Sequence, residues 1–246
     1  MKKLTKEAIE QLALKMRLQA GLNPSEPIHT KTLLRKLGIM VIYRPLSEKA
    51  CGLSMRSSDG RAKFMLINSE NSRGRQHFTI CHELFHLYYD EEPKPHICGT
   101  SGLEKDPAEI NANTFASALL LPQAGVLESI PTDEIVNRHI STATMLRVEQ
   151  LFGVSHQSLC YCLRHLRLLT EEELQDHLAE SMEIQQIATE YGYDLSLYQP
   201  GNEGVVIGDF GEKARLLFEQ ERISEGHYAE LLSLLKQGCR MERKTR

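Results

Sequence analysis

Three residues in the first half of the chain have the types and spacing of a metal site: His82, Glu83 and His86. On a helix, residues four apart lie on one face, so the two histidines can offer imidazole nitrogens to a single metal ion. Glu83 lies beside that face, where it can act on a water molecule bound to the metal. The pattern therefore predicts metal-dependent hydrolysis. The alternative is a buried helix that carries these side chains by chance.

A helix from about Phe78 to Tyr89 is expected to hold the motif. Apolar residues and both histidines lie on one face of this helix, which comprises Phe78, Cys81, His82, Phe85, His86 and Tyr89. The histidines therefore belong to the face that is turned toward the protein interior. We expect a polar loop over Asn68 to Gly74 before the helix, and a loop over residues 90–105 after it.

A third ligand has to come from elsewhere, because a tetrahedral zinc ion held by two histidines needs one more protein ligand and an open position for water. A second helix is predicted from Asp106, and it carries Glu109 as the candidate ligand. Asp106 and Glu109 also have the spacing of a capping box, which would give Glu109 a purely structural role. Asn113, four residues further on, can hold the second nitrogen of a ligand histidine. These residues alone leave both roles of Glu109 open.

The elements before the motif predict a small antiparallel sheet packed with helices. Apolar spacing indicates helices over residues 5–20 and from about Thr30, followed by strands over residues 39–44, 52–56 and 62–67. An edge strand beside the metal would bind an extended peptide by strand addition, although the sequence does not tell which strand is the edge.

Composition excludes some classes of protein. The chain has 29 Lys and Arg against 33 Asp and Glu, a net charge of −4, so no global basic field draws it to nucleic acid. We expect a cytoplasmic protein without a membrane span, because there is no long apolar run and the N-terminus enters an amphipathic pattern directly. The six cysteines form no C-x-x-C pair and are expected to be free thiols.

The second half of the chain is predicted to be mainly helical. Two helices joined by a turn over residues 151–155 resemble a helix-turn-helix within residues 141–169. The basic side chains available for phosphate contacts there are few: Arg164 and Arg167, with His156 and His165. A helical subdomain that packs on the catalytic part is therefore preferred to a DNA-binding one. Residues 170–246 contain no constellation of metal ligands or nucleophiles.

Four linked segments carry a resemblance to a known family. They read R-x-x-F-T, H-E-x-x-H, E-x-x-A-N-x-F-A and L-L-x-P, at Arg75–Thr79, His82–His86, Glu109–Ala116 and Leu119–Pro122. Together they resemble the ImmA/IrrE metallopeptidases, closely over roughly residues 62–125 and loosely over about 5–168. His77 and Asn111 depart from the pattern, which often has Arg and Glu at these positions, but neither is an expected ligand.

Residues 170–246 are expected to form a mainly helical region. For the rest of an α+β protein, the resemblance implies a zincin-like metallopeptidase domain over residues 1–140 and a helix-turn-helix-like helical subdomain over 141–169. It implies that His82, His86 and Glu109 are the metal ligands and that Asn113 supports one of them. Zinc is the expected metal and manganese the alternative. By the same chemistry, Glu83 is the general base.

Two functions follow from this reading. The first is a metal-dependent endopeptidase which, as the resemblance implies, cuts a helix-turn-helix transcriptional repressor at one site and so derepresses phage, mobile-element or stress genes. The alternative is a DNA- or protein-binding regulator, associated with a phage or a toxin–antitoxin system, whose metal site is structural. Glu83 discriminates between them, since a peptidase needs this carboxylate and a regulator does not.

Overall fold

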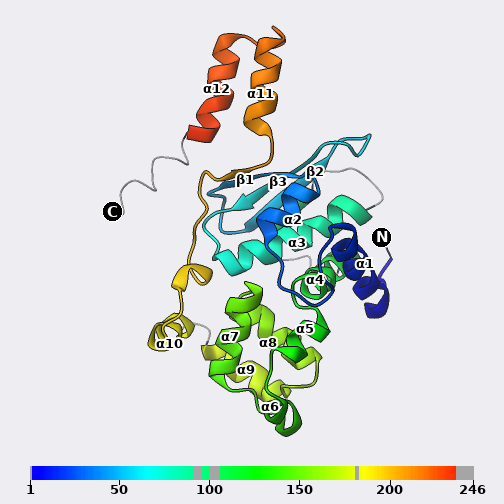
Figure 1. Ribbon diagram of the computed structural model, residues 1–246, viewed down its shortest axis with the longest axis vertical. Coiled ribbons are helices and arrows are strands. Elements are labelled where there is room, and N and C mark those ends of the chain that lie inside the picture. The colour runs from blue at the N-terminus through cyan, green and yellow to red at the C-terminus, as the bar shows by residue number, and fades with distance from the viewer. Residues whose placement is uncertain (1, 91–95, 100–105, 181–182, 237–246) are drawn as a thin grey trace.

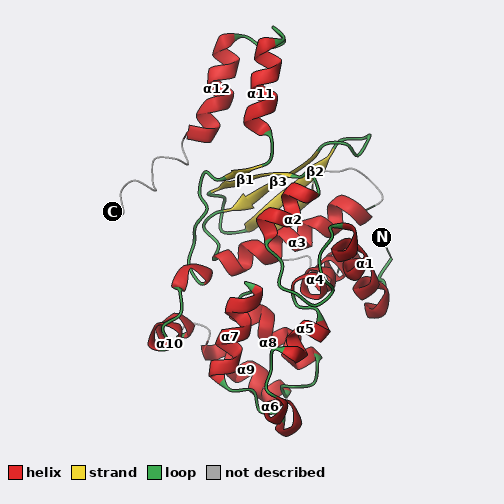
Figure 2. Cartoon of the chain, viewed as in Figure 1, coloured by secondary structure: helices red, strands yellow, loops and turns green. Residues whose placement is uncertain are grey.

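The computed structural model describes residues 2–90, 96–99, 106–180 and 183–236. Helices and one small sheet alternate along this part of the chain, which confirms the predicted α+β class (Figure 2). The first half consists of α1 (Lys6–Gln19), α2 (Thr30–Lys36), β1 (Met40–Arg44), β2 (Ala50–Arg56), β3 (Lys63–Asn68), α3 (Arg73–Tyr89), β4 (His96–Gly99) and α4 (Pro107–Leu120). The second half consists of α5 (Gln123–Glu128), α6 (Thr132–Asn137), α7 (Thr142–Phe152), α8 (His156–His165), α9 (Glu171–Glu180), α10 (Ile184–Glu190), the 3₁₀ turn η1 (Leu195–Leu197), β5 (Val206–Ile207), α11 (Phe210–Glu219) and α12 (Glu225–Lys236).

The sheet is mixed, so the expectation of an antiparallel sheet was wrong in one respect. Its strand order is β4-β2-β3-β1-β5, and β1 runs parallel to β3 while the other neighbours are antiparallel. The hairpin of β2 and β3 inserts β3 beside β1, so that strands consecutive in sequence, β1 and β2, are not neighbours. β3 is therefore central, and its Met65 and Ile67 are fully buried. Sequence periodicity gives the strands but not which strands pair.

The edge strands both come from segments that are distant from the three predicted strands. β4 lies within residues 90–105, where a loop was expected, and it pairs with β2. The remaining residues of that predicted loop, 91–95 and 100–105, lie outside the described part of the chain. β5 comes from the predicted C-terminal helical region and pairs with β1. The division into domains at residues 140 and 169 stays a prediction.

Helix α3 lies along one face of the sheet (Figure 1) and begins earlier than the sequence suggested. Ser72 caps it, because its side chain accepts a hydrogen bond from the Arg75 amide, so the helix starts at Arg73 and the preceding loop is shorter than predicted. From Thr79 to Leu87 every residue of α3 is buried, which places the histidine motif between the sheet and α4.

Helix α4 packs across α3 and is fixed at both ends. Arg17 of α1, itself buried, donates hydrogen bonds to the Leu119 carbonyl at 3.0 and 2.6 Å and so satisfies the C-terminal end of α4. Burial lowers the pKa of Arg17 to about 10. Near the other end, the side chain of Asn111 accepts from the Leu4 amide and donates to the Lys2 carbonyl. An amide at this position can both accept and donate a hydrogen bond, which a carboxylate cannot.

The helix-turn-helix-like pair α7 and α8 shares one apolar core with the helices and sheet around the motif. Gly153 makes the turn with a positive φ of 63°, a conformation that favours glycine. Glu149 of α7 is fully buried, where it accepts hydrogen bonds from the His156 ring at 2.6 Å and the Tyr198 hydroxyl at 3.0 Å. His156 was considered as a phosphate contact, and that reading was wrong because its ring is only 5% exposed.

Helices α11 and α12 form a pair that projects from the far side of the sheet, away from α7–α9 (Figure 1). The stacked rings of Phe218 and Tyr228, with centroids 4.7 Å apart, hold the pair together. No helix in the described part of the chain is long and apolar enough to cross a membrane.

Candidate metal centre

The two motif histidines bring their Nε2 atoms to one point. His82 and His86 lie one turn apart on α3, and their Nε2 atoms are 3.1 Å from each other. Both residues are buried, with exposed fractions of 2% and 4%. The structure therefore places two imidazole nitrogens where a single ion would contact both.

The other ring nitrogens fix the protonation of both histidines. His86 Nδ1 lies 2.8 Å from Asp90 Oδ2, and His82 Nδ1 lies 2.9 Å from Asn113 Oδ1. Since a carboxylate or an amide oxygen only accepts, each neutral ring carries its proton on Nδ1 and keeps a lone pair on Nε2. Two lone pairs at 3.1 Å repel unless a cation lies between them. The donor set thus fits a metal ion.

Glu109 completes the group from α4. Its Oε2 is 3.3 Å from His82 Nε2 and its Oε1 is 3.6 Å from His86 Nε2. Ligand atoms of the three residues all lie within 4.8 Å of one another. Asp106 caps α4 by accepting from the Ala108 amide. The Glu109 carboxylate faces the histidines, as a ligand would.

Glu83 is fully buried beside the histidines, and a strand holds it in place. Ser54 of β2, also buried, donates its hydroxyl to Glu83 Oε2 at 2.5 Å. This hydrogen bond fixes the orientation of the Glu83 carboxylate beside the histidines. The role of Ser54 could not be predicted from the sequence, because nothing in it indicates which residue of β2 faces α3.

Asp90 was also missed, although the sequence carries a signal for it. Asp90 follows His86 by four residues, as His86 follows His82, so the three can share one helical face. The helix ends at Tyr89 with Asp90 as its C-cap, and the carboxylate still reaches the ring of His86. Metal-binding histidines commonly donate their second nitrogen to such a partner.

The side chains near the motif that can donate a hydrogen bond to an oxyanion are those of Arg75, His77, Tyr88, Tyr89 and His96. Tyr89 donates to the Leu12 carbonyl at 3.4 Å. His77 Nδ1 lies 2.8 Å from the Gly153 carbonyl, so its ring joins α3 to the turn before α8. Arg75 donates to Cys51 Sγ at 3.3 Å. The side chain of His96 lies outside the described part of the structure.

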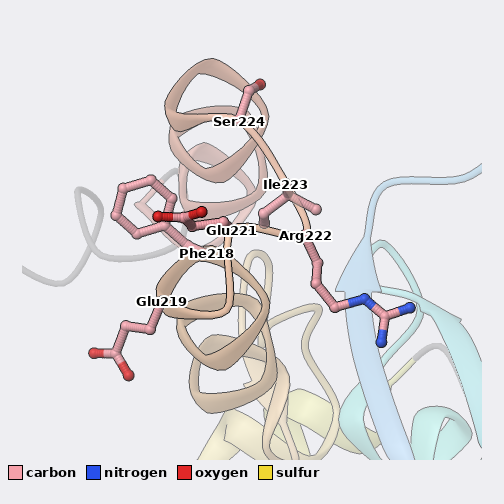
Figure 3. Close-up of a pocket in the computed structure, with 6 residues that line it drawn as sticks. All are labelled: Phe218, Glu219, Glu221, Arg222, Ile223 and Ser224. Carbon is pink, nitrogen blue, oxygen red and sulfur yellow. The ribbon is translucent and has the colours of Figure 1, made fainter.

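A cleft of about 1020 Å³ has Asn113, the partner of His82 Nδ1, in its lining, whereas His82, His86 and Glu109 do not line it. Residues of α1, α3, α4 and α8 line it. The α8 residues on this wall are Gln157, Ser158, Tyr161, Cys162 and His165. A second pocket, of about 600 Å³, lies at the turn between α11 and α12 (Figure 3). It is lined by residues 218, 219 and 221–224, none of which belongs to the histidine site.

The fold and the site together define an α+β protein with a buried two-histidine, one-glutamate centre on crossing helices. Residues 34–164 match the model of the IrrE N-terminal-like domain, peptidase family M78. Because this match covers more than half of the chain, the protein belongs to that metallopeptidase-type family. The resemblance inferred from the four motifs is thereby confirmed.

The chain was also compared with curated proteins and with solved structures. No curated protein matches the chain. Among solved structures, a Mycobacterium tuberculosis transcriptional regulator is similar, with 17% identity and a TM-score of 0.43. The alignment covers 64% of this chain and 46% of that one, so the chain spans less than half the length of the regulator.

Proposed function

We propose that this protein is a zinc-dependent endopeptidase in which His82, His86 and Glu109 hold the metal and Glu83 is the general base. The observation that carries the proposal is the convergence of two buried Nε2 lone pairs, 3.1 Å apart, on the carboxylate of Glu109. Manganese is the alternative metal. A zinc ion in this site would lower the pKa of water to about 7 and polarise a peptide carbonyl.

The residues of the chain supply the remaining steps. Glu83 takes the proton of the attacking water and returns it to the leaving amine, and the hydroxyl of Ser54 donates a hydrogen bond to its carboxylate. Asn113 and Asp90 keep both Nε2 lone pairs directed at the metal. Burial of all three ligands limits competing water.

A protein substrate is favoured by the shape of the site. The cleft of about 1020 Å³ is open at the surface and runs between α1, α4 and α8 toward Asn113, which suits a peptide segment. By family resemblance we propose a helix-turn-helix transcriptional repressor as the substrate and derepression of phage, mobile-element or stress genes as the result. Incubation with candidate repressors, followed by mass spectrometry of the fragments, tests this assignment.

The alternative of a DNA-binding regulator with a structural metal has less support. In a helix-turn-helix the second helix must enter the major groove. Here Tyr161 and His165 of α8 line the cleft together with residues of α1, α3 and α4. The ring of His156, at the start of α8, is hydrogen-bonded to the buried carboxylate of Glu149. We therefore assign α8 as a wall of the substrate cleft.

The experiment that tests the metal site is metal content by mass spectrometry on untagged wild type beside Glu109→Ala. We expect near-stoichiometric zinc in the wild type and a sharp loss in the variant, because one of three ligands is gone. Glu128→Ala, at an exposed position on α5, is the matched control and should keep the metal. A wild type that folds but takes up no zinc or manganese would refute the proposal.

A further inference from the structure

Cys98 lies on the face of the sheet that is turned toward the metal centre. β4 is an edge strand antiparallel to β2, and Cys98 is paired with Gly52. Partners directly across a sheet point to the same face. Gly52 faces α3 so closely that a Cβ there would lie 2.8 Å from the Thr79 methyl group. The missing side chain of Gly52 thus leaves room for the Cys98 thiol between the sheet and α3.

The thiol is within reach of the residues that form the site. Ligand atoms of Cys98, His82 and Glu83 all lie within 4.8 Å of one another, the same limit that contains the His82, His86 and Glu109 group. A thiolate is a favoured zinc ligand, and His82 belongs to both groups.

A second thiol stands beside the first. The pairing of β2 with β4 shifts register between Ala50 and Gly52, and such a bulge re-aims a side chain. Cys51, the residue at the bulge, is buried and accepts a hydrogen bond from Arg75 of α3 at 3.3 Å. The Cys98 thiol is within hydrogen-bonding reach of the Cys51 sulfur. Both cysteines are free in the structure.

We propose that Cys98 is a sulfur ligand which closes the open position of the metal in the reduced protein, and that disulfide formation with Cys51 withdraws it. This inference rests on the metal site proposed above. A site with four protein ligands is closed in the manner of structural zinc sites, whereas catalysis needs one position free. The pair of cysteines would therefore make the peptidase responsive to oxidants.

The step balances with a peroxide as the oxidant. The Cys98 thiolate and the Cys51 thiol lose two electrons and form one S–S bond, while hydrogen peroxide accepts them. Together with the Cys51 proton and one proton from solvent, the peroxide gives two molecules of water. The zinc is neither oxidised nor reduced and keeps His82, His86 and Glu109.

X-ray absorption at the zinc edge of the full-length protein tests the inference without measuring activity. The protein is loaded with zinc and reduced by a phosphine, which adds no thiol. We expect one sulfur at about 2.3 Å in the wild type and only nitrogen and oxygen in Cys98→Ser, with unchanged zinc content. Cys51→Ser is the matched control and should keep the sulfur.

Addition of one equivalent of hydrogen peroxide then distinguishes the roles of the two cysteines. In the wild type the zinc–sulfur signal should disappear while zinc is retained, and peptide mapping should find Cys51 linked to Cys98. In Cys51→Ser the sulfur should remain, because its partner is missing. A sulfur signal that survives in Cys98→Ser, or in wild type that contains the mapped disulfide, would overturn the inference.

The outcome also separates this inference from the proposed function. Reduced wild type that holds stoichiometric zinc with nitrogen and oxygen ligands alone would refute the role of Cys98 and leave the His82, His86 and Glu109 site standing. Wild type that binds no metal would refute both.

Discussion

Replacement of Asp90 by alanine should weaken metal binding although Asp90 does not contact the metal. Its carboxylate lies 2.8 Å from His86 Nδ1 and keeps the Nε2 lone pair directed at the centre. A hydrogen bond that involves a charged group contributes about 1.5–3 kcal/mol. The Asp90 side chain is 25% exposed, so solvent weakens the bond and the lower end of that range applies. At about 1.4 kcal/mol for each factor of ten, we expect roughly a tenfold higher Kd for zinc.

The assay is competition of the protein with a chromophoric zinc chelator at fixed pH and salt. Asp90→Asn retains an acceptor oxygen and should fall between wild type and Asp90→Ala. Asp176→Ala, at an exposed position on α9, is the control for loss of one acidic group. A Kd for Asp90→Ala within twofold of wild type, or an equal loss in Asp176→Ala, would refute the argument that Asp90 orients His86.

Three further predictions concern the base, the buried pair and the core. Glu83→Gln should keep zinc and lose peptide cleavage, since an amide cannot take the proton of water; turnover retained in that variant would exclude Glu83 as the base. Burial alone would lower the pKa of His156, but hydrogen bonds with Cys160 and Glu149 and the charge of Glu149 raise it to about 10. The stability from this pair is therefore fully present below the unfolded pKa of about 6.5 and is lost as the pH rises through about 10. In urea unfolding, the free energy of unfolding of wild type should exceed that of Glu149→Gln by an amount that shrinks toward alkaline pH. A difference that stays constant with pH would contradict the assignment. Phe115→Ala, a fully buried ring whose centroid is 5.6 Å from that of Phe85, should lower the free energy of unfolding by about 3–5 kcal/mol, and a loss below 1 kcal/mol would mean that the two rings do not hold α3 on α4.

The function of the helix-turn-helix-like segment depends on what surrounds it. Its helices and its glycine turn were predictable, because capping serines and a glycine mark them in the sequence. Its position along the cleft was not, since the α8 residues that line the cleft are polar or mixed in character. Part of the α8 surface, including Tyr161 and His165, here lines the cleft of about 1020 Å³.

The sequence alone determined the local structure of this protein, which comprises the helix and strand positions and the spacing within the motif. The four-residue spacing of His82 and His86 follows from the geometry of one helix, and the capping and apolar patterns give most helix and strand positions. The role of Glu109 was not decided by spacing, because Asp106 and Glu109 fit a capping box equally well. The family resemblance, carried by linked motifs, selected Glu109 as a ligand, and the fold brings its carboxylate to both histidines.

Only the tertiary structure decided the contacts between distant segments. Ser54 reaches Glu83 from β2, and Cys98 reaches the same site from an edge strand that the sequence presented as a loop. The sheet is mixed because β3 inserts beside β1, and β5 joins from residues 206–207. Strand pairing and side-chain convergence depend on the packing of the whole chain, whereas periodicity and capping act within a few residues. For this reason the motif and Asn113 could be identified from the sequence, whereas Ser54 and Cys98 could not.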